Sequence, residues 1–156
     1  MDFKIKKTLE LLRALKTLRS KGKKIVFTNG CFDILHVGHI RYLIKAKRLG
    51  DILVVALNSD SSVRAMKGKD RPIIRQRDRA RVLASLYFVD YVTIFDDPTP
   101  EKLIMLIRPD ILAKGGDWRV KDIVGSDFVR SHGCRVVRIP FVKGYSTTSL
   151  IRKIAK

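Results

Sequence analysis

The spacing of apolar residues constrains the fold of this chain more than any other feature. Short runs rich in β-branched residues, typical of strands, are predicted at 25–28, 52–57, 91–95, 111–113 and 136–139. Amphipathic stretches with helical spacing are predicted at about 4–20 and at 38–49, 78–88, 100–107, 120–131 and 147–154. Because the strands are apolar on both faces, this alternation predicts an α/β fold, a doubly wound Rossmann-like parallel sheet with helices on both faces.

Length and composition narrow the class further. The chain has 156 residues, of which 46% are apolar, enough for one packed core and too many for a disordered basic tail. Its apolar runs are far shorter than the roughly 18–20 residues that cross a bilayer, and its first residues lack the apolar core of a signal peptide. Two cysteines, Cys31 and Cys134, are too few for a disulfide framework. We therefore expect a single cytoplasmic domain over 1–156, with the N-terminal helix packed on it and no membrane contact.

The charge of the chain points to anionic ligands. The formal net charge is +18, and a field of this sign attracts nucleic acids, anionic membranes and phosphorylated metabolites alike. Only 8% of residues are aromatic, and the basic residues are scattered rather than interleaved with aromatics on one face, which disfavours nucleic acid. A need for solubility or a thermophilic host would explain the same excess of basic over acidic residues. The charge alone therefore does not identify the ligand.

The connection after the first predicted strand carries the strongest motif, T-N-G-C-F-D-I-L-H-V-G-H at 28–39. In a doubly wound sheet, ligands bind beyond the carboxyl ends of the strands, near the reversal of strand order. Gly30 and Gly38 let the backbone approach a ligand, and the N–H groups at the start of the next helix favour an anion. His36 and His39, three residues apart, share one helix face and can donate hydrogen bonds to one phosphate chain. The motif indicates a phosphate-binding turn.

Two other interpretations of the histidine pair remain open. Both side chains could be structural. They could instead form a metal site with Asp33 or Cys31, although the Glu and the third spaced ligand of known zinc patterns are missing. On the phosphate-binding interpretation Asp33 orients one imidazole, and no residue is assigned as a metal ligand.

The string G-C-F-D-I-L-H-V-G-H, with the later Y-S-T-T-S-L-I-R-K, resembles the nucleotidyltransferase superfamily that carries an H-x-G-H motif, in particular its cytidylyltransferase-like branch. Further segments resemble the adenylyltransferases that convert D-glycero-β-D-manno-heptose 1-phosphate to ADP-heptose for lipopolysaccharide or related glycans. These segments are K-I-V-F-T-N-G-C-F-D-I-L-H, A-L-N-S-D-S-S-V-R, K-G-x-x-R-P-I, V-L-A-S-L, K-G-G-D-W and S-T-T. The resemblance covers nearly the whole chain. It implies that a sugar phosphate attacks ATP, releasing pyrophosphate, with Mg²⁺ bound through the ATP phosphates.

Residue chemistry and this resemblance together assign roles. The expected catalytic residues are His36, His39 and Arg79. The residues expected on the nucleotide are Thr28, Asn29, Gly30, Cys31, Phe32, Gly38, Asn58, Lys69, Tyr145, Ser146, Thr147 and Thr148. The residues expected on the acceptor are Asp33, Lys114, Gly116, Asp117 and Trp118.

Simpler roles stay open for three of these segments. An ordinary N-cap would explain Ser146 to Thr148, and a structural turn would explain the glycines after Lys114. Lys69, on a loop with Lys67 and Arg71 that could close over the triphosphate, could be merely solvated.

The chain also departs from the family pattern. Cytidylyltransferases of this branch usually show R-T-E-G-I-S-T-T before the last helix, whereas this chain has F-V-K-G-Y-S-T-T, with Phe141 in place of the arginine. This weighs against CTP as the nucleotide substrate.

The heptose enzyme is often fused to a sugar kinase, so a separate kinase is expected to supply the acceptor, and a homodimer is expected from the resemblance. The alternatives are a transferase using glycerol 3-phosphate with CTP or a flavin mononucleotide with ATP, and a non-catalytic nucleotide- or nucleic-acid-binding module.

Overall fold

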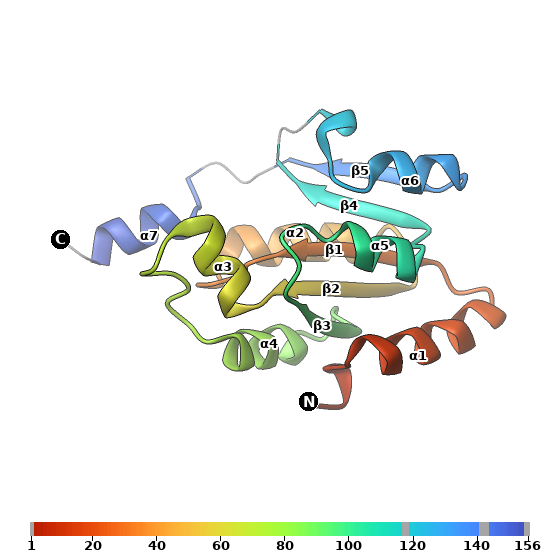
Figure 1. Cartoon of the computed structure of the whole chain (residues 1–156), viewed down its shortest axis with the longest axis horizontal. Helices are drawn as coiled ribbons and strands as arrows, with labels where there is room; N and C mark the ends of the chain where they lie inside the picture. Colours follow the sequence, from red (N-terminus) through yellow and green to blue (C-terminus); the bar gives the residue numbers. More distant parts are fainter. Residues whose placement is uncertain (1, 117–118, 141–143, 155–156) are drawn as a thin grey trace.

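The computed structural model describes residues 2–116, 119–140 and 144–154, and its centre is one parallel sheet (Figure 1). The strands lie in the order β3-β2-β1-β4-β5, and every neighbouring pair is parallel. They are β1 (Ile25–Gly30), β2 (Ile52–Asn58), β3 (Tyr91–Phe95), β4 (Ile111–Gly115) and β5 (Arg135–Ile139). The chain runs outward from β1 to β3 and then returns to place β4 beside β1. This reversal of strand order confirms the predicted doubly wound fold.

Helices connect the strands. They are α1 (Thr8–Ser20), α2 (Val37–Lys47), α3 (Asp60–Lys67), α4 (Gln76–Ser85), α5 (Glu101–Ile107), α6 (Ser126–Ser131) and α7 (Thr147–Ile154), with the 3-10 turns η1 (Asp2–Lys4) and η2 (Val120–Asp122). Within the described part of the chain, no helix combines the length and the apolar character that a membrane span requires.

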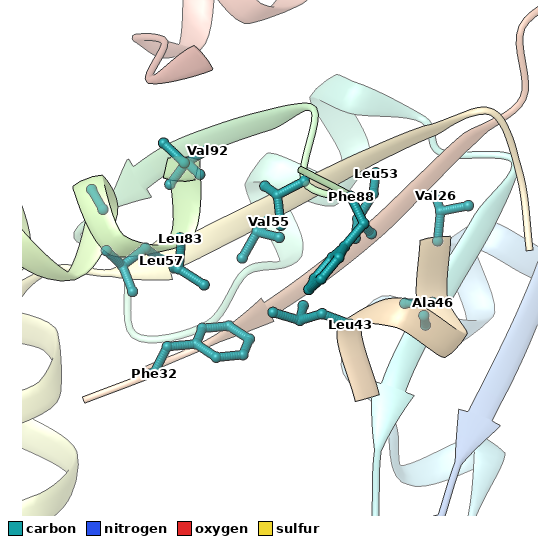
Figure 2. Close-up of a cluster of buried hydrophobic side chains, with 14 of the residues drawn as sticks. Val26, Phe32, Leu43, Ala46, Leu53, Val55, Leu57, Leu83, Phe88 and Val92 are labelled. Atoms are coloured by element: carbon teal, nitrogen blue, oxygen red, sulfur yellow. The ribbon is translucent and has the colours of Figure 1, made fainter. Parts of the chain in front are cut away.

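The sheet buries apolar side chains on both faces, because successive residues of a strand point to opposite sides. Leu53, Val55 and Leu57 of β2 pack with side chains of α2 and α4 (Figure 2). Val54 and Ala56, between them in the sequence, pack on the other face with side chains of α1, α5 and α6. The near-continuous apolar run of β2 is therefore explained by burial on both sides.

Two helical segments differ from the prediction. Helix α3 lies in a segment predicted only as the connection after β2; the Ser59 side chain caps it, accepting a hydrogen bond from the Ser62 N–H. The helix predicted at 120–131 is split into η2 and α6 around Gly125, whose φ is +81°. A Cβ at Gly125 would lie 2.7 Å from Cδ1 of Ile104, so the break is fixed by both backbone conformation and space.

The pairing of β1 with β4, at the point where the strand order reverses, is short. Among the described residues the two strands pair only at Val26 with Ile111 and at Phe27 with Leu112. Both strands continue past these pairs, to Gly30 and Gly115. Their carboxyl ends are therefore free to line a ligand site between them.

Candidate active site

A pocket of about 570 Å³ lies at the carboxyl ends of β1 and β4. This is the edge of the sheet at which the sequence predicts a ligand. Its walls come from the turn after β1, the first half of α2, the ends of α3 and β4, and the segment that opens α7. The residues lining it are Asn29, Gly30, Cys31, Phe32, His36, Gly38, His39, Tyr42, Lys67, Lys114, Gly115, Gly144, Tyr145, Ser146, Thr147 and Thr148.

The two motif histidines meet at the start of α2. His36 is the N-cap residue, and its Nδ1 accepts a hydrogen bond of 3.1 Å from the Gly38 N–H. The His39 ring stacks on the His36 ring, with centroids 3.9 Å apart and planes inclined by 23°. Because Nδ1 of His36 is an acceptor, the neutral ring carries its proton on Nε2. His36 thus keeps an N–H donor available at the pocket wall.

The surroundings of the histidines favour neutral rings. Burial, with smaller contributions from the positive charges of Lys67 and of a protonated His36, lowers the pKa of His39 to about 4. Burial also lowers the pKa of His36. The buried Nδ1 of His39 has no hydrogen-bond partner within the protein. At neutral pH both rings are therefore uncharged, and each carries one N–H donor.

The lowered pKa of His39 predicts a pH dependence of stability. Between pH 6.5 and about 4 the unfolded chain binds a proton at His39 that the folded chain does not. The free energy of unfolding should therefore fall as the pH falls through this window. Chemical denaturation at pH 7 and pH 5 should show a smaller decrease for His39→Asn than for the wild type. Equal decreases in the two proteins would contradict the buried, neutral ring.

Gly38 is required by space beside the histidines. A Cβ at this position would lie 2.9 Å from the His36 ring and 3.2 Å from Cβ of Tyr145. The Tyr145 ring itself lies nearly parallel to that of His36, with centroids 6.3 Å apart. Glycine therefore lets the segment before α7 close against the start of α2.

Two side chains bridge the diverging ends of β1 and β4. Lys114 Nζ donates a 3.0 Å hydrogen bond to the Asn29 side-chain oxygen. The Tyr42 hydroxyl donates to the Ala113 carbonyl at 3.1 Å and lies 2.5 Å from the Thr28 hydroxyl. Tyr42 was not predicted as a site residue, because an aromatic residue in an amphipathic helix has the same sequence pattern as a core residue.

Lys114 is a cation that its protein neighbours do not neutralise. Burial lowers its pKa, since desolvation disfavours the charged ammonium. No ion pair joins Lys114 to a carboxylate within the described ranges. An anionic ligand in the pocket would supply the missing countercharge.

The segment that opens α7 lines the pocket beside the start of α2. Ser146 Oγ accepts a 3.0 Å hydrogen bond from the Ser149 N–H, so this serine is an N-cap as well as a lining residue. The Thr147 hydroxyl donates to the Ile34 carbonyl at 3.5 Å. Hydroxyl side chains are thus gathered at a helix N-terminus that lines the pocket, an arrangement that favours an anion.

A model of the cytidylyltransferase-like family matches residues 27–153, a span that contains the whole histidine turn and the opening of α7. The chain belongs to the cytidylyltransferase-like family. This confirms the family resemblance seen in the sequence motifs.

Relatives of this cytidylyltransferase-like chain include two proteins named bifunctional protein HldE. The one from Syntrophotalea carbinolica is 53% identical over 153 residues, which are 98% of this chain and 31% of that protein. The one from Nitratiruptor sp. is 56% identical over 139 residues, which are 89% of this chain and 29% of that protein. The chain therefore spans about a third of the length of these relatives.

Solved structures resemble the cytidylyltransferase-like chain as well. The lipopolysaccharide core biosynthesis protein from Thermoplasma volcanium superposes with a TM-score of 0.63 and 32% identity, over 80% of this chain and all of that one. Pantothenate synthetase from Thermus thermophilus superposes with a TM-score of 0.59 and 18% identity, over 90% of this chain and 68% of that one. The second likeness concerns the fold alone.

Several expected contact residues of this family member lie outside the pocket. Arg79 is buried, and its guanidinium is bonded to protein groups, so the expected direct contact with the triphosphate is not what the structure shows. The Asp33 carboxylate accepts hydrogen bonds from Arg71 Nε and the Ile73 and Ile74 N–H groups, and orients neither histidine. Both groups are buried charges, which need partners of opposite charge and hydrogen bonds, and both find them within the protein.

The remaining differences are local. Thr28 and Asn58 are buried beneath the pocket, where they support Tyr42 and Ser62. The exposed Lys69 does not line the pocket, whereas Lys67, the last residue of α3, does. Gly116 donates its N–H to the Ile139 carbonyl, and the neighbouring Gly115 lines the pocket instead. Asp117, Trp118 and Phe141 lie outside the described residues.

The metal-site alternative gains no third ligand. In the described part of the chain, no three His, Cys, Asp or Glu side chains are grouped closely enough to hold a metal ion. Asp33, the carboxylate nearest in sequence to the histidines, is engaged with the loop at 71–74.

Proposed function

We propose that the chain is an adenylyltransferase that transfers AMP from ATP to D-glycero-β-D-manno-heptose 1-phosphate, giving ADP-heptose and pyrophosphate. The observation that carries the proposal is one pocket that combines the stacked histidines, the hydroxyls opening α7 and the un-neutralised Lys114. The motif resemblance to heptose 1-phosphate adenylyltransferases and the likeness to a lipopolysaccharide core biosynthesis protein support this acceptor.

The reaction needs alignment more than a strong base. A phosphate monoester, with its second pKa at about 6, is already an anionic nucleophile at neutral pH. Its oxygen forms a bond to the α-phosphorus of ATP while the bond from that phosphorus to the pyrophosphate oxygen breaks. The leaving pyrophosphate takes the electron pair. Rate enhancement then comes from holding the two anions in line and stabilising the charge that develops on the leaving group.

The pocket residues fit these tasks. His36 and His39, at the N-terminus of α2, supply N–H donors toward the phosphate chain of ATP, and Ser146 to Thr148 supply hydroxyls at the start of α7. Lys114, at the end of β4, is suited to the phosphate of the acceptor. The described lining contains no carboxylate, which fits Mg²⁺ carried by the ATP phosphates, where it would neutralise their charge. We further propose a cytoplasmic homodimer that receives heptose 1-phosphate from a sugar kinase.

Lys114→Gln should weaken binding of the acceptor and leave binding of the nucleotide nearly unchanged. Loss of a charge-assisted contact should raise the KM for the sugar phosphate about tenfold or more and leave the Kd for ATP within about threefold. Steady-state kinetics and calorimetric titration with ATP check this. Lys45→Gln, at an exposed position of α2, is the matched control. An unchanged KM for the acceptor, or an equal loss of ATP affinity, would contradict the assignment.

Pyrophosphate release with Mg²⁺ tests the function as a whole. ATP and CTP are each combined with heptose 1-phosphate, glycerol 3-phosphate and a flavin mononucleotide. Release with ATP and heptose 1-phosphate alone is the expected result. Release with another pair would replace the substrate, and no release together with steeply salt-dependent binding of DNA or RNA would favour a binding module.

A further inference from the structure

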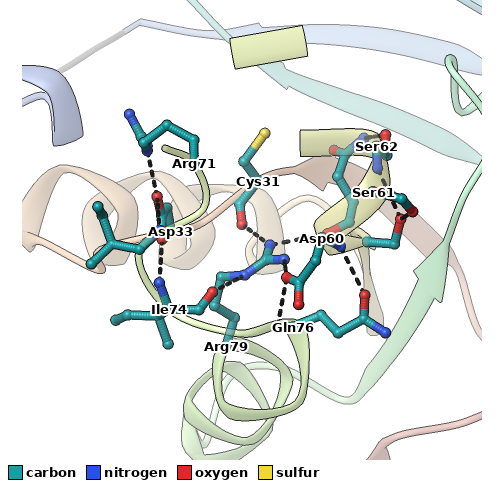
Figure 3. Close-up of polar contacts among 12 residues, drawn as sticks. Cys31, Asp33, Asp60, Ser61, Ser62, Arg71, Ile74, Gln76 and Arg79 are labelled. Atoms are coloured by element: carbon teal, nitrogen blue, oxygen red, sulfur yellow. Dashed lines mark hydrogen bonds and ion pairs between the residues drawn. The ribbon is translucent and has the colours of Figure 1, made fainter. Parts of the chain in front are cut away.

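A fully buried arginine lies behind the histidine turn. The Arg79 side chain is 0% exposed and is held by three separate segments of the chain (Figure 3). Its Nη1 donates to the Cys31 carbonyl at 2.5 Å and to the Asn58 carbonyl at 3.0 Å. Its Nε donates to the Ile74 carbonyl at 2.8 Å, and its Nη2 donates to Asp60 Oδ1 at 2.6 Å. The guanidinium fork thus joins the turn after β1, the end of β2 and the loop before α4.

The acidic partner of Arg79 is itself fixed in place. Asp60 is the first residue of α3, and Gln76 is the first residue of α4. The Asp60 N–H donates to Gln76 Oε1, and the Gln76 N–H donates to Asp60 Oδ1, both at 2.8 Å. This reciprocal pair ties together the starts of two helices that hold the guanidinium. The carboxylate that binds Arg79 is therefore held in place by the first residues of two helices.

The carbonyl that Arg79 holds precedes a strained residue. Phe32 has φ of +42°, in the left-handed region that a bulky side chain rarely adopts. Its buried ring packs edge-on against the ring of His39, with centroids 5.3 Å apart. Asp33, the next residue, is anchored to the loop at 71–74. The backbone is thus fixed on both sides of Phe32.

We propose that Arg79 is a positioning residue for nucleotidyl transfer, holding the Cys31 carbonyl so that Phe32 keeps the left-handed conformation that seats His39 against His36. Arg79 then acts on the reaction through the turn and makes no contact with the triphosphate. The effect on turnover rests on the proposed function, whereas the effect on His39 does not. We call the hydrogen bonds of the Arg79 guanidinium to Cys31, Asn58, Asp60 and Ile74 the Arg79 clamp. The clamp also positions α3, whose last residue, Lys67, lines the pocket.

Two variants test the clamp. Arg79→Lys keeps the charge but loses the fork that reaches three segments at once. Asp60→Asn keeps the size of the partner and removes its charge. In Arg79→Lys, kcat should fall about thirtyfold or more while the KM for ATP stays within about threefold, because a small displacement of a reacting group is costly. Asp60→Asn should show a smaller change in the same direction.

The ionisation of His39 is the readout that a purely structural role would not change. When the turn relaxes, the ring should become solvated, and its pKa should rise from about 4 toward 6.5. NMR titration of the imidazole signals measures this without substrate. Ile107→Val, a core change on the opposite face of the sheet, is the control. It should lower the melting temperature and leave both the His39 titration and the turnover near wild type.

The outcomes separate the possibilities. A His39 titration that is unchanged in both variants would overturn the proposal, whatever the turnover. An unchanged titration with ATP binding weakened more than tenfold would show that Arg79 acts on the triphosphate directly. If Arg79→Lys does not fold, the titration of His39 in Asp60→Asn tests the proposal instead. A wild type that releases no pyrophosphate would refute the proposed function, and the shift of the His39 pKa would still decide on the clamp.

Discussion

Replacing His39 with alanine should reduce the turnover of ATP and the sugar phosphate about a hundredfold or more, with the fold preserved. The loss is of the order seen when one preorganised donor to a developing negative charge is removed. His39 is placed for this role by its stacking on His36 and its contact with Phe32. Because the ring is neutral at pH 7, it acts as an N–H donor and not as a charged imidazolium. The rate of pyrophosphate release at saturating substrates is the quantity to measure.

The control for this change is the remaining histidine. His132 is exposed after α6, where its Nδ1 lies 2.8 Å from the Phe128 carbonyl. His132→Ala should therefore turn over at the wild-type rate. Circular dichroism should show that His39→Ala keeps the α/β signature, although the cavity it leaves lowers the melting temperature. Turnover within about threefold of wild type in His39→Ala would refute the role of this residue.

Replacing Asp33 with alanine should lower the free energy of unfolding by about 3–5 kcal/mol, because removing one partner of a buried ion pair leaves the other uncompensated. The Asp33 side chain is only 1% exposed and lies 2.6 Å from Arg71 Nε. It also accepts the N–H groups of Ile73 and Ile74, at 3.0 and 2.9 Å. The variant would bury a guanidinium and two N–H groups without partners.

Chemical denaturation at pH 7 measures the stability of Asp33→Ala. The exposed pair of Arg119 and Asp122 provides the comparison, since Asp122→Ala should cost less than about 1 kcal/mol. Equal losses in the two variants would contradict a structural role for Asp33 in fixing the turn.

The stability gap between wild type and Asp33→Ala should depend on pH. Burial by itself would raise the pKa of Asp33, but the N–H groups of Ile74 and Ile73 and the nearby Arg71 outweigh it and hold the pKa below 3.8. A carboxyl with a lowered pKa contributes stability that is present above 3.8 and is lost as the pH falls through the folded value. The gap should therefore be constant from pH 7 to pH 5 and narrow below 3.8. A gap that closes already at pH 5 would contradict the buried network.

Much of the fold follows from local pattern. The run at 52–57 is apolar throughout because both faces of β2 are covered, and this pattern also placed the other strands within a few residues. The position of the pocket follows from topology, since the return of the chain from β3 to β4 creates the gap beside β1. The three-residue spacing of His36 and His39 is enough to predict that the two rings meet.

The parts that could not be predicted depend on tertiary contacts. Whether the guanidinium of Arg79 faces a ligand or the backbone is decided by the carbonyls of Cys31 and Asn58, which a motif does not reveal. Helix α3 is polar, and its first residue is held by Gln76, sixteen positions later. Tyr42 acquires its place in the pocket only because β1 and β4 diverge beneath it.

The most direct test of the central claim uses heptose 1-phosphate labelled with ¹⁸O in the non-bridging oxygens of its phosphate. The labelled sugar phosphate is incubated with ATP, Mg²⁺ and the protein, and the masses of the products are measured by mass spectrometry. We expect ADP-heptose that keeps the whole label and an equal amount of unlabelled pyrophosphate, because the acceptor phosphate attacks the α-phosphorus. Absence of the nucleotide sugar, or label in the pyrophosphate, would contradict the proposed reaction.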